Sequence, residues 1–170
     1  MKIYLGGSVT SSERDLPRLK MIKSFLMKMG HQVVGGALKK SVKSSNRKVA
    51  LNLYKRELEL ISTSDLMIAE VTNPSWGTAF LMEDALEHDK PVLALFYRDN
   101  GKDLSVMMKG HPELYVEHYD EDNLHAVLVK NLKHFKEMKQ KCGKLVAIDG
   151  ADGSGKATQT KLILKYLKKN

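Results

Sequence analysis

The apolar positions of the first 135 residues follow two spacings that alternate along the chain. Nearly continuous apolar runs, typical of buried strands, lie at residues 2–5, 32–34, 65–71, 91–96 and 114–119. Between them, apolar residues recur at the spacing of one helix face over residues 13–29, 49–61, 77–88 and 122–138. Apolar strands separated by helices predict a doubly wound, Rossmann-like or flavodoxin-like α/β fold, with a parallel sheet that carries helices on both faces.

Small and hydroxyl residues follow several of the predicted strands. Gly7 and Ser8 follow the first strand, Ser75 and Gly77 begin the helix after the third, and Ser105 lies in the loop after the fourth. In such sheets, ligands bind beyond the carboxyl ends of the strands. Hydroxyls and backbone N–H groups at helix starts suit a phosphate. The alternative is that Ser8 and Ser75 only cap helices.

The C-terminal residues carry a separate pattern. Residues 145–160 read LVAIDGADGSGKATQT, an apolar strand-like run that enters a glycine-rich loop and then a predicted helix. The backbone of such a loop surrounds a phosphate and its lysine adds a point charge, which gives the candidate residues Gly150, Gly153, Gly155, Lys156 and Thr158. One strand and one helix bury too little apolar surface to be stable alone. We therefore expect a domain over 1–135, a basic linker over 136–144 and a partial phosphate-loop segment over 145–170.

The net charge of +8 arises entirely in the last part of the chain. Residues 130–170 contain eleven lysines against Glu137, Asp149 and Asp152, and eleven minus three is eight. These lysines recur at helical spacing without interleaved arginines, so a solvated helix face explains them better than a nucleic-acid site. Cys142 is the only cysteine, which excludes an internal disulfide, and no apolar run is long enough to span a membrane. We expect a cytoplasmic protein.

Four segments of the first 135 residues resemble the nucleoside 2-deoxyribosyltransferase family. They are KIYLGGS at 2–8, SDLMIAEVTNPSWG at 64–77, KPVLALF at 90–96 and LSVMMKG at 104–110. The resemblance is strongest to the deoxynucleoside monophosphate N-glycosidases and runs in the same order over nearly all of residues 1–135. It implies a doubly wound sheet, a homodimeric active site and reaction at the N-glycosidic bond of a deoxynucleoside monophosphate. It implies no cofactor for this part of the chain.

The resemblance also implies roles for single residues. The family uses a glutamate as nucleophile at the anomeric carbon, an aspartate near the base and a tyrosine that positions the nucleophile. Tyr4 matches that tyrosine and Asp65 the aspartate. Ser8, Ser75 and Ser105 match phosphate contacts, and the last of these reaches across the dimer interface in the family. A serine at 75, rather than an acid, favours a phosphorylated substrate because a carboxylate there would repel the phosphate.

The nucleophile of the family is missing from its expected place. Alignment of residues 74–85 without gaps puts Leu81 where the family has its glutamate, and a leucine cannot attack an anomeric carbon. Glu83 and Asp84 are the next carboxylates, and Glu83 is the candidate replacement, although both also fit a solvated helix flank. Two functions follow. The domain hydrolyses deoxynucleoside monophosphates to free base and deoxyribose phosphate, or it is a catalytically silent nucleotide-binding module.

The tail resembles the start of a thymidylate kinase, through AIDGADGSGKATQ at 147–159. Ala157 stands where a serine or threonine usually coordinates magnesium. The resemblance implies that this chain is the front part of a fusion with a kinase that phosphorylates dTMP. It implies ATP and Mg²⁺ as ligands only if the kinase segment is completed.

Overall fold

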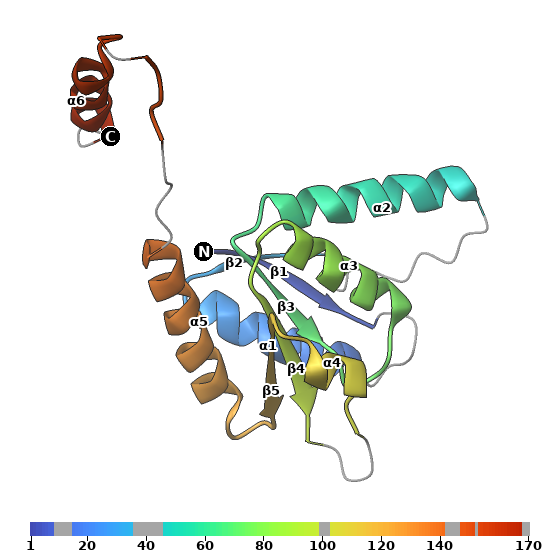
Figure 1. Cartoon of the computed structure of the whole chain (residues 1–170). Coiled ribbons are helices and arrows are strands. Elements are labelled where there is room, and N and C mark those ends of the chain that lie inside the picture. The colour runs from blue at the N-terminus through green and yellow to red at the C-terminus, as the bar shows by residue number, and fades with distance from the viewer. Residues whose placement is uncertain (9–14, 36–45, 99–102, 142–146, 152, 168–170) are drawn as a thin grey trace. The chain divides into compact units, whose positions relative to one another are not determined.

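The computed structural model describes residues 1–8, 15–35, 46–98, 103–141, 147–151 and 153–167 (Figure 1). By its internal contacts the chain divides into two compact units, residues 1–135 and 136–170. The first unit is built on one parallel sheet of five strands in the order β2-β1-β3-β4-β5. The strands are β1 (Lys2–Gly7), β2 (Gln32–Val34), β3 (Leu66–Glu70), β4 (Val92–Tyr97) and β5 (Leu114–Tyr119). This is the flavodoxin-like order, in which the winding reverses between β1 and β3. The predicted fold class is confirmed.

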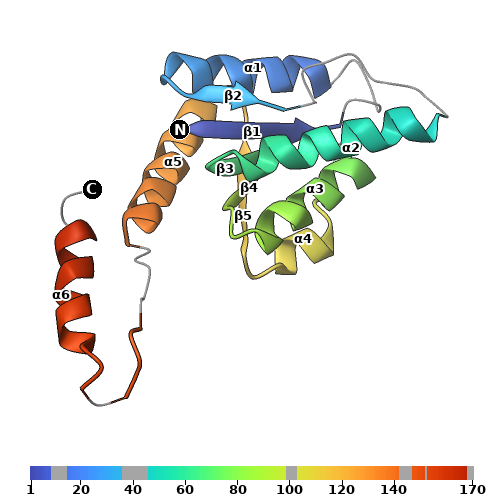
Figure 2. The ribbon, with the colours of Figure 1, turned by 90° about the horizontal axis from the view of Figure 1, so that it is seen from above.

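Helices cover both faces of the sheet, as Figures 1 and 2 show. They are α1 (Asp15–Lys28), α2 (Arg47–Ser62), α3 (Trp76–Glu87), α4 (Val106–Gly110) and α5 (Leu124–Lys141). Leu19, Ile22 and Leu26 of α1 and Leu128 of α5 share one buried cluster with Ile3, Leu5, Ile68 and Leu95 of the sheet. A second cluster joins Ile61 of α2 and Met82 and Ala85 of α3 to Tyr4, Met67, Ala69 and Ala94. Successive strand residues point to opposite faces, so the continuous apolar runs supply both clusters.

Several boundaries differ from the predictions. The helix α4 was not predicted, since five residues are too few to show a helical period. Helix α5 continues to Lys141, so the first residues of the predicted linker 136–144 are helical. Residues 147–150 form no strand, because a lone strand finds no partner for its backbone hydrogen bonds. The helix predicted after the phosphate loop is present as α6 (Lys156–Leu167).

Candidate active site

The carboxyl ends of β1 and β3 bring two of the predicted serines to the same edge of the sheet. Gly7 pairs with Glu70 in the register of β1 and β3, so Ser8 and Val71 follow the two strands at the same level. Ser8 is buried. Ser75 is the N-cap of α3, and its Oγ accepts a hydrogen bond from the Thr78 N–H at 3.3 Å. This edge therefore carries hydroxyl groups. The twelve-residue helix α3 also begins there, and the N–H groups of its first turn have no carbonyl partner within the helix.

The two predicted glycines differ in their surroundings. A Cβ at Gly77 would meet no atom within 4 Å, so the first turn of α3 is open to an approaching ligand. A Cβ at Gly7 would lie 2.9 Å from Cδ2 of Leu19, so this glycine serves the packing of α1 on the sheet. Ser105 is exposed at the start of α4, and its side chain makes no capping hydrogen bond to that helix.

Tyr4 of β1 points to the face that α2 and α3 cover, and its hydroxyl donates to Oε2 of Glu57 at 2.8 Å. Tyr4 is 2% exposed and Glu57 is 6% exposed. The other carboxylate oxygen, Oε1, accepts no hydrogen bond from the described part of the chain, and Nη2 of Arg56 lies 3.6 Å from it. The pair thus places a buried carboxylate, held by a phenol, beneath α2.

The structure does not bring Asp65 into this site. Asp65 precedes β3, at the amino end of the sheet, about 20 Å along the strand from the carboxyl edge. Its N–H donates to the Lys2 carbonyl at 2.7 Å, and its Oδ2 accepts from the Lys2 N–H at 2.8 Å. These bonds hold the start of β1 against the start of β3, which gives Asp65 a structural role.

Leu81 lies on α3 one turn beyond Thr78, and it packs against the cluster that contains Tyr4. Glu83 projects to a different side of the helix. Its Oε2 lies 3.9 Å from Nε2 of His111, beside a groove of about 190 Å³ between α3 and α4. Oδ2 of Asp84 lies 3.8 Å from Nδ1 of His88, four residues along the chain. Neither carboxylate is brought to the Tyr4 hydroxyl, so the structure does not support Glu83 as the replacement for the missing glutamate.

A second buried carboxylate lies at the carboxyl edge, on the opposite face of the sheet. Oε1 of Glu70 accepts from the Thr72 hydroxyl, and from the Tyr119 hydroxyl at 3.3 Å. The Thr72 hydroxyl also accepts the Tyr97 N–H at 2.7 Å. Burial, and then the negative charge of Glu70, raise the pKa of Tyr119 well above its ordinary value. This network ties together the ends of β3, β4 and β5.

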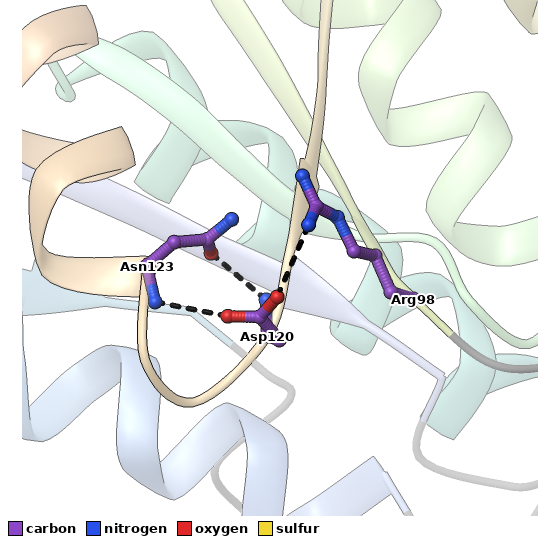
Figure 3. A network of polar contacts seen from close by, with 3 residues as sticks. All are labelled: Arg98, Asp120 and Asn123. Carbon is purple, nitrogen blue, oxygen red and sulfur yellow. Dashed lines mark hydrogen bonds and ion pairs between the residues drawn. The ribbon is translucent and has the colours of Figure 1, made fainter.

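The ends of β4 and β5 are joined by the contacts in Figure 3. Nη1 of Arg98 lies 3.4 Å from Oδ2 of Asp120. Oδ1 of Asp120 accepts the Asn123 N–H at 2.9 Å, and Oδ1 of Asn123 accepts the Asp120 N–H at the same distance. This reciprocal pair resembles a capping box and begins α5. It fixes the frame around the site.

Sequence reasoning missed Glu57 and Glu70. The available signal was a charged residue at a buried position: Glu57 stands one turn before Ile61 on the inward side of α2, and Glu70 ends an apolar strand. Charged side chains are rarely buried without a partner, so an acid in such a position indicates a specific local network.

The glycine-rich loop of the second unit has positive φ angles at Gly153 (+81°) and Gly155 (+82°). Nζ of Lys156 donates to the carbonyl of Gly150, and to that of Ala151 at 3.0 Å. Thr158 is exposed in the first turn of α6. The lysine therefore closes the loop onto its own carbonyls.

Two absences hold for the residues that the structure describes. No group of three or more His, Cys, Asp or Glu side chains among them could hold a metal ion. None of their helices is both long and apolar enough to cross a bilayer.

Comparison with solved structures supports the fold. A 2-deoxyribosyltransferase of Bacillus psychrosaccharolyticus superposes with a TM-score of 0.58 at 19% identity, over 74% of this chain and 90% of that one. A CMP N-glycosidase of Clostridium botulinum gives 0.52 at 14% identity, over 76% and 99%. At these identities the likeness establishes the shared architecture alone.

Comparison of sequences goes further, although no protein-family model matches the chain. A Nematostella vectensis protein provisionally named 2′-deoxynucleoside 5′-phosphate N-hydrolase 1 is 31% identical over 134 residues, 75% of this chain and 91% of that protein. The 5-hydroxymethyl-dUMP N-hydrolase of Esox lucius is 30% identical over 141 residues, 78% and 97%. That of Danio rerio is 29% identical over 133 residues, 75% and 93%. The chain therefore belongs to the family of nucleoside 2-deoxyribosyltransferases and deoxynucleoside monophosphate N-hydrolases.

Proposed function

We propose that residues 1–135 bind a 2′-deoxynucleoside 5′-monophosphate at the carboxyl edge of the sheet and hydrolyse its N-glycosidic bond. The products are a free base and deoxyribose 5-phosphate. The observation that carries the proposal is the buried carboxylate of Glu57, held at 2.8 Å by the Tyr4 hydroxyl on the face of the sheet that α3 covers. An oxocarbenium-like transition state at C1′ needs such a carboxylate nearby. The names of the relatives point to the same reaction.

The 5′-phosphate would bind at the start of α3. Ser75 and Gly77 offer a hydroxyl and open backbone N–H groups there, and the helix dipole favours an anion at this end. Ser8 follows β1 at the same edge. Arg18 of α1, whose guanidinium lies 4.6 Å from the centre of the Tyr97 ring, adds positive charge beside the ends of the strands.

We also propose that the active form is a homodimer. Large apolar side chains are exposed on the same side of the sheet, on α2, α3 and α4: Leu51, Tyr54, Trp76, Phe80, Val106 and Met107. Trp76 is 88% exposed and Phe80 73%. A patch of this kind on a soluble protein marks an interaction surface. The family resemblance implies that Ser105, which is exposed at the start of α4, would reach the neighbouring site in such a dimer.

Leu81 favours a second candidate function. If the reaction needs a carboxylate at this position of α3, the domain binds the nucleotide without turning it over. It would then be a regulatory module for a kinase on the same parent chain. The phosphate-loop geometry of the second unit, with glycines at positive φ and Lys156 at the start of α6, supports a thymidylate-kinase-like segment there. Such a segment would need ATP and Mg²⁺, and a surrounding kinase sheet.

Release of free base, followed by chromatography, tests the two candidates. The substrates are the four common deoxynucleoside monophosphates, dUMP and its 5-hydroxymethyl derivative, with unphosphorylated deoxynucleosides and ribonucleotides as controls. Calorimetry measures binding of the same compounds. Turnover of deoxynucleotides alone supports the hydrolase. Binding without turnover supports the silent module, and absence of both would contradict the assignment of the site.

A further inference from the structure

The first half of α2 carries a concentrated positive charge. Residues 32–56 contain no aspartate or glutamate, although the net charge of the chain arises in its last part. The same residues include seven cations: Lys39, Lys40, Lys43, Arg47, Lys48, Lys55 and Arg56. The last four lie on the described helix. Nη2 of Arg56 lies 3.6 Å from the Glu57 carboxylate, which offsets its charge. The other three, Arg47, Lys48 and Lys55, are exposed, and we call them the basic arm.

The basic arm does not serve the stability of the helix. The N-terminus of a helix carries a partial positive charge, so acids stabilise its first turn and cations weaken it. Helix α2 nevertheless begins with Arg47 and Lys48 and has no acid in its first turn. Neither residue has an acid three or four positions further on, where an ion pair along the helix would form. A role outside the helix explains these cations better.

The basic arm lies at the end of the sheet that carries the proposed nucleotide site. Glu57 contacts Tyr4 in the middle of β1. Thr63, just past the end of α2, accepts a hydrogen bond from Lys2 at the start of β1, so α2 runs antiparallel to that strand. The ten residues of α2 before Glu57 span about 15 Å, whereas β1 continues past Tyr4 for only about 10 Å. The first turn of α2 therefore passes the carboxyl edge, and Figures 1 and 2 show it beyond the arrowhead of β1.

The other described cations near the ends of the strands are mostly neutralised or half-buried. Nη1 of Arg98 lies 3.4 Å from Oδ2 of Asp120, and Nζ of Lys109 donates to Oδ1 of Asp103. A neighbouring acid cancels most of the field that a cation produces at a distance. Arg18 is half-buried on α1. Long-range positive charge on this side of the molecule therefore comes from the basic arm.

We propose that the basic arm attracts the 5′-phosphate of the nucleotide toward the carboxyl edge and so raises the rate at which the substrate associates. The inference rests on the proposed nucleotide site. Field lines from a group of like charges guide an approaching ion of opposite sign over distances at which no direct contact exists. A neutral deoxynucleoside is not attracted, so the arm also favours the phosphorylated form of the substrate.

The size of the effect follows from Coulomb attraction and its screening. Three cations at about 15 Å from a phosphate dianion, in water with about 20 mM salt, raise the local concentration of the dianion about fourfold. At about 0.5 M salt the screening length is only about 4 Å, so the attraction disappears. The dissociation rate is set by contacts within the site and stays the same.

The experiment measures association by stopped-flow fluorescence, with dUMP that carries an N-methylanthraniloyl label on its 3′-oxygen. It compares the unchanged protein with the triple variant Arg47→Gln, Lys48→Gln, Lys55→Gln. We expect the association rate constant of the variant to be about fourfold lower at about 20 mM NaCl and equal to that of the unchanged protein at about 0.5 M NaCl. The dissociation rate constant and the circular dichroism spectrum should not change, because the three side chains are exposed.

A matched control removes the same amount of charge from elsewhere. Lys28 ends α1 and Lys90 precedes β4, so both lie at the amino end of the sheet. Lys133 is exposed on α5, close to Phe135, whose ring contacts Tyr115 at the start of β5. The triple variant Lys28→Gln, Lys90→Gln, Lys133→Gln should therefore bind labelled dUMP nearly as fast as the unchanged protein.

Three results would overturn the inference while leaving the nucleotide site intact. They are an unchanged association rate in the arm variant at low salt, equal slowing in the control variant, and slowing that persists at about 0.5 M NaCl. The second would show that only net charge matters, and the third would reveal a structural defect. If the unchanged protein binds neither labelled dUMP nor any nucleotide in calorimetry, the proposed function fails and this inference fails with it.

Discussion

Replacement of Tyr4 by phenylalanine tests how much the buried hydrogen bond between Tyr4 and Glu57 contributes to the free energy of unfolding. The change removes one oxygen atom whose hydrogen bond to Glu57 is 2.8 Å long, and it leaves the carboxylate 6% exposed with no hydrogen bond from the described residues. A hydrogen bond to a charged group contributes about 1.5–3 kcal/mol, and leaving the charge buried adds to the loss. We expect the free energy of unfolding to fall by about 2–3 kcal/mol. With an m-value of about 2 kcal/mol/M in urea, the midpoint moves down by about 1 M.

A double-mutant cycle separates the hydrogen bond from the packing of the ring. In a Glu57→Leu background the carboxylate is gone, so Tyr4→Phe should cost less than about 0.5 kcal/mol, which gives a coupling energy of about 2 kcal/mol. Unfolding is best followed by circular dichroism, because the only tryptophan, Trp76, is 88% exposed and reports little on the core. A coupling energy near zero, with Tyr4→Phe costing under 0.5 kcal/mol in both backgrounds, would refute this account of the pair.

Three further results are expected. Ser75→Ala removes the N-cap of α3, so urea titration should show that the free energy of unfolding falls by about 1 kcal/mol. Calorimetry should show a weaker affinity for deoxynucleoside monophosphates. An unchanged affinity would exclude Ser75 from the phosphate site. Burial alone would raise the pKa of Glu117, but the hydrogen bonds from Lys130 and Asn131 outweigh it and hold the pKa below 4.5. The stabilisation that these hydrogen bonds give the fold is present above about pH 4.5 and is lost as the pH falls through the lowered pKa. Urea titrations should therefore show that Glu117→Gln destabilises the protein more at pH 7 than at pH 3. Equal effects at the two pH values would contradict this. If the protein forms the proposed homodimer, Phe80→Glu should convert it to a monomer in sedimentation experiments, while Leu16→Glu on α1 should not. A dimer that survives Phe80→Glu would place the interface elsewhere.

The fold could be predicted because its information is local and repeated. Strands β2 and β5 lie at the predicted residues, and the other three differ by one or two residues at their ends. Parallel strands buried on both faces must be apolar throughout, so each one stands out from the helices as a continuous run. Helix α4 is too short for its period to be visible. The apolar run before the phosphate loop resembles a strand in sequence, but a strand also requires a neighbour.

The edge that gathers Ser8 and Ser75 was predictable for a different reason. Ser8 and Ser75 come directly after strands, and the carboxyl ends of parallel strands meet at one edge. The same rule separates Asp65, which comes before its strand and so lies at the other end of the sheet. Similarity to a family motif pointed to Asp65, whereas the direction of the strand places it at the amino end of the sheet.

The sequence by itself determined the order of strands and helices along the chain and the edge of the sheet at which the hydroxyls gather. It also determined that position 81 holds a leucine and not a carboxylate. Only the tertiary structure decided which acid the tyrosine holds. Tyr4 and Glu57 are 53 residues apart, and their contact depends on how α2 lies over β1, which no periodicity encodes. Local patterns report whether a residue is buried, while the partner of a buried polar group is set by packing between elements distant in sequence.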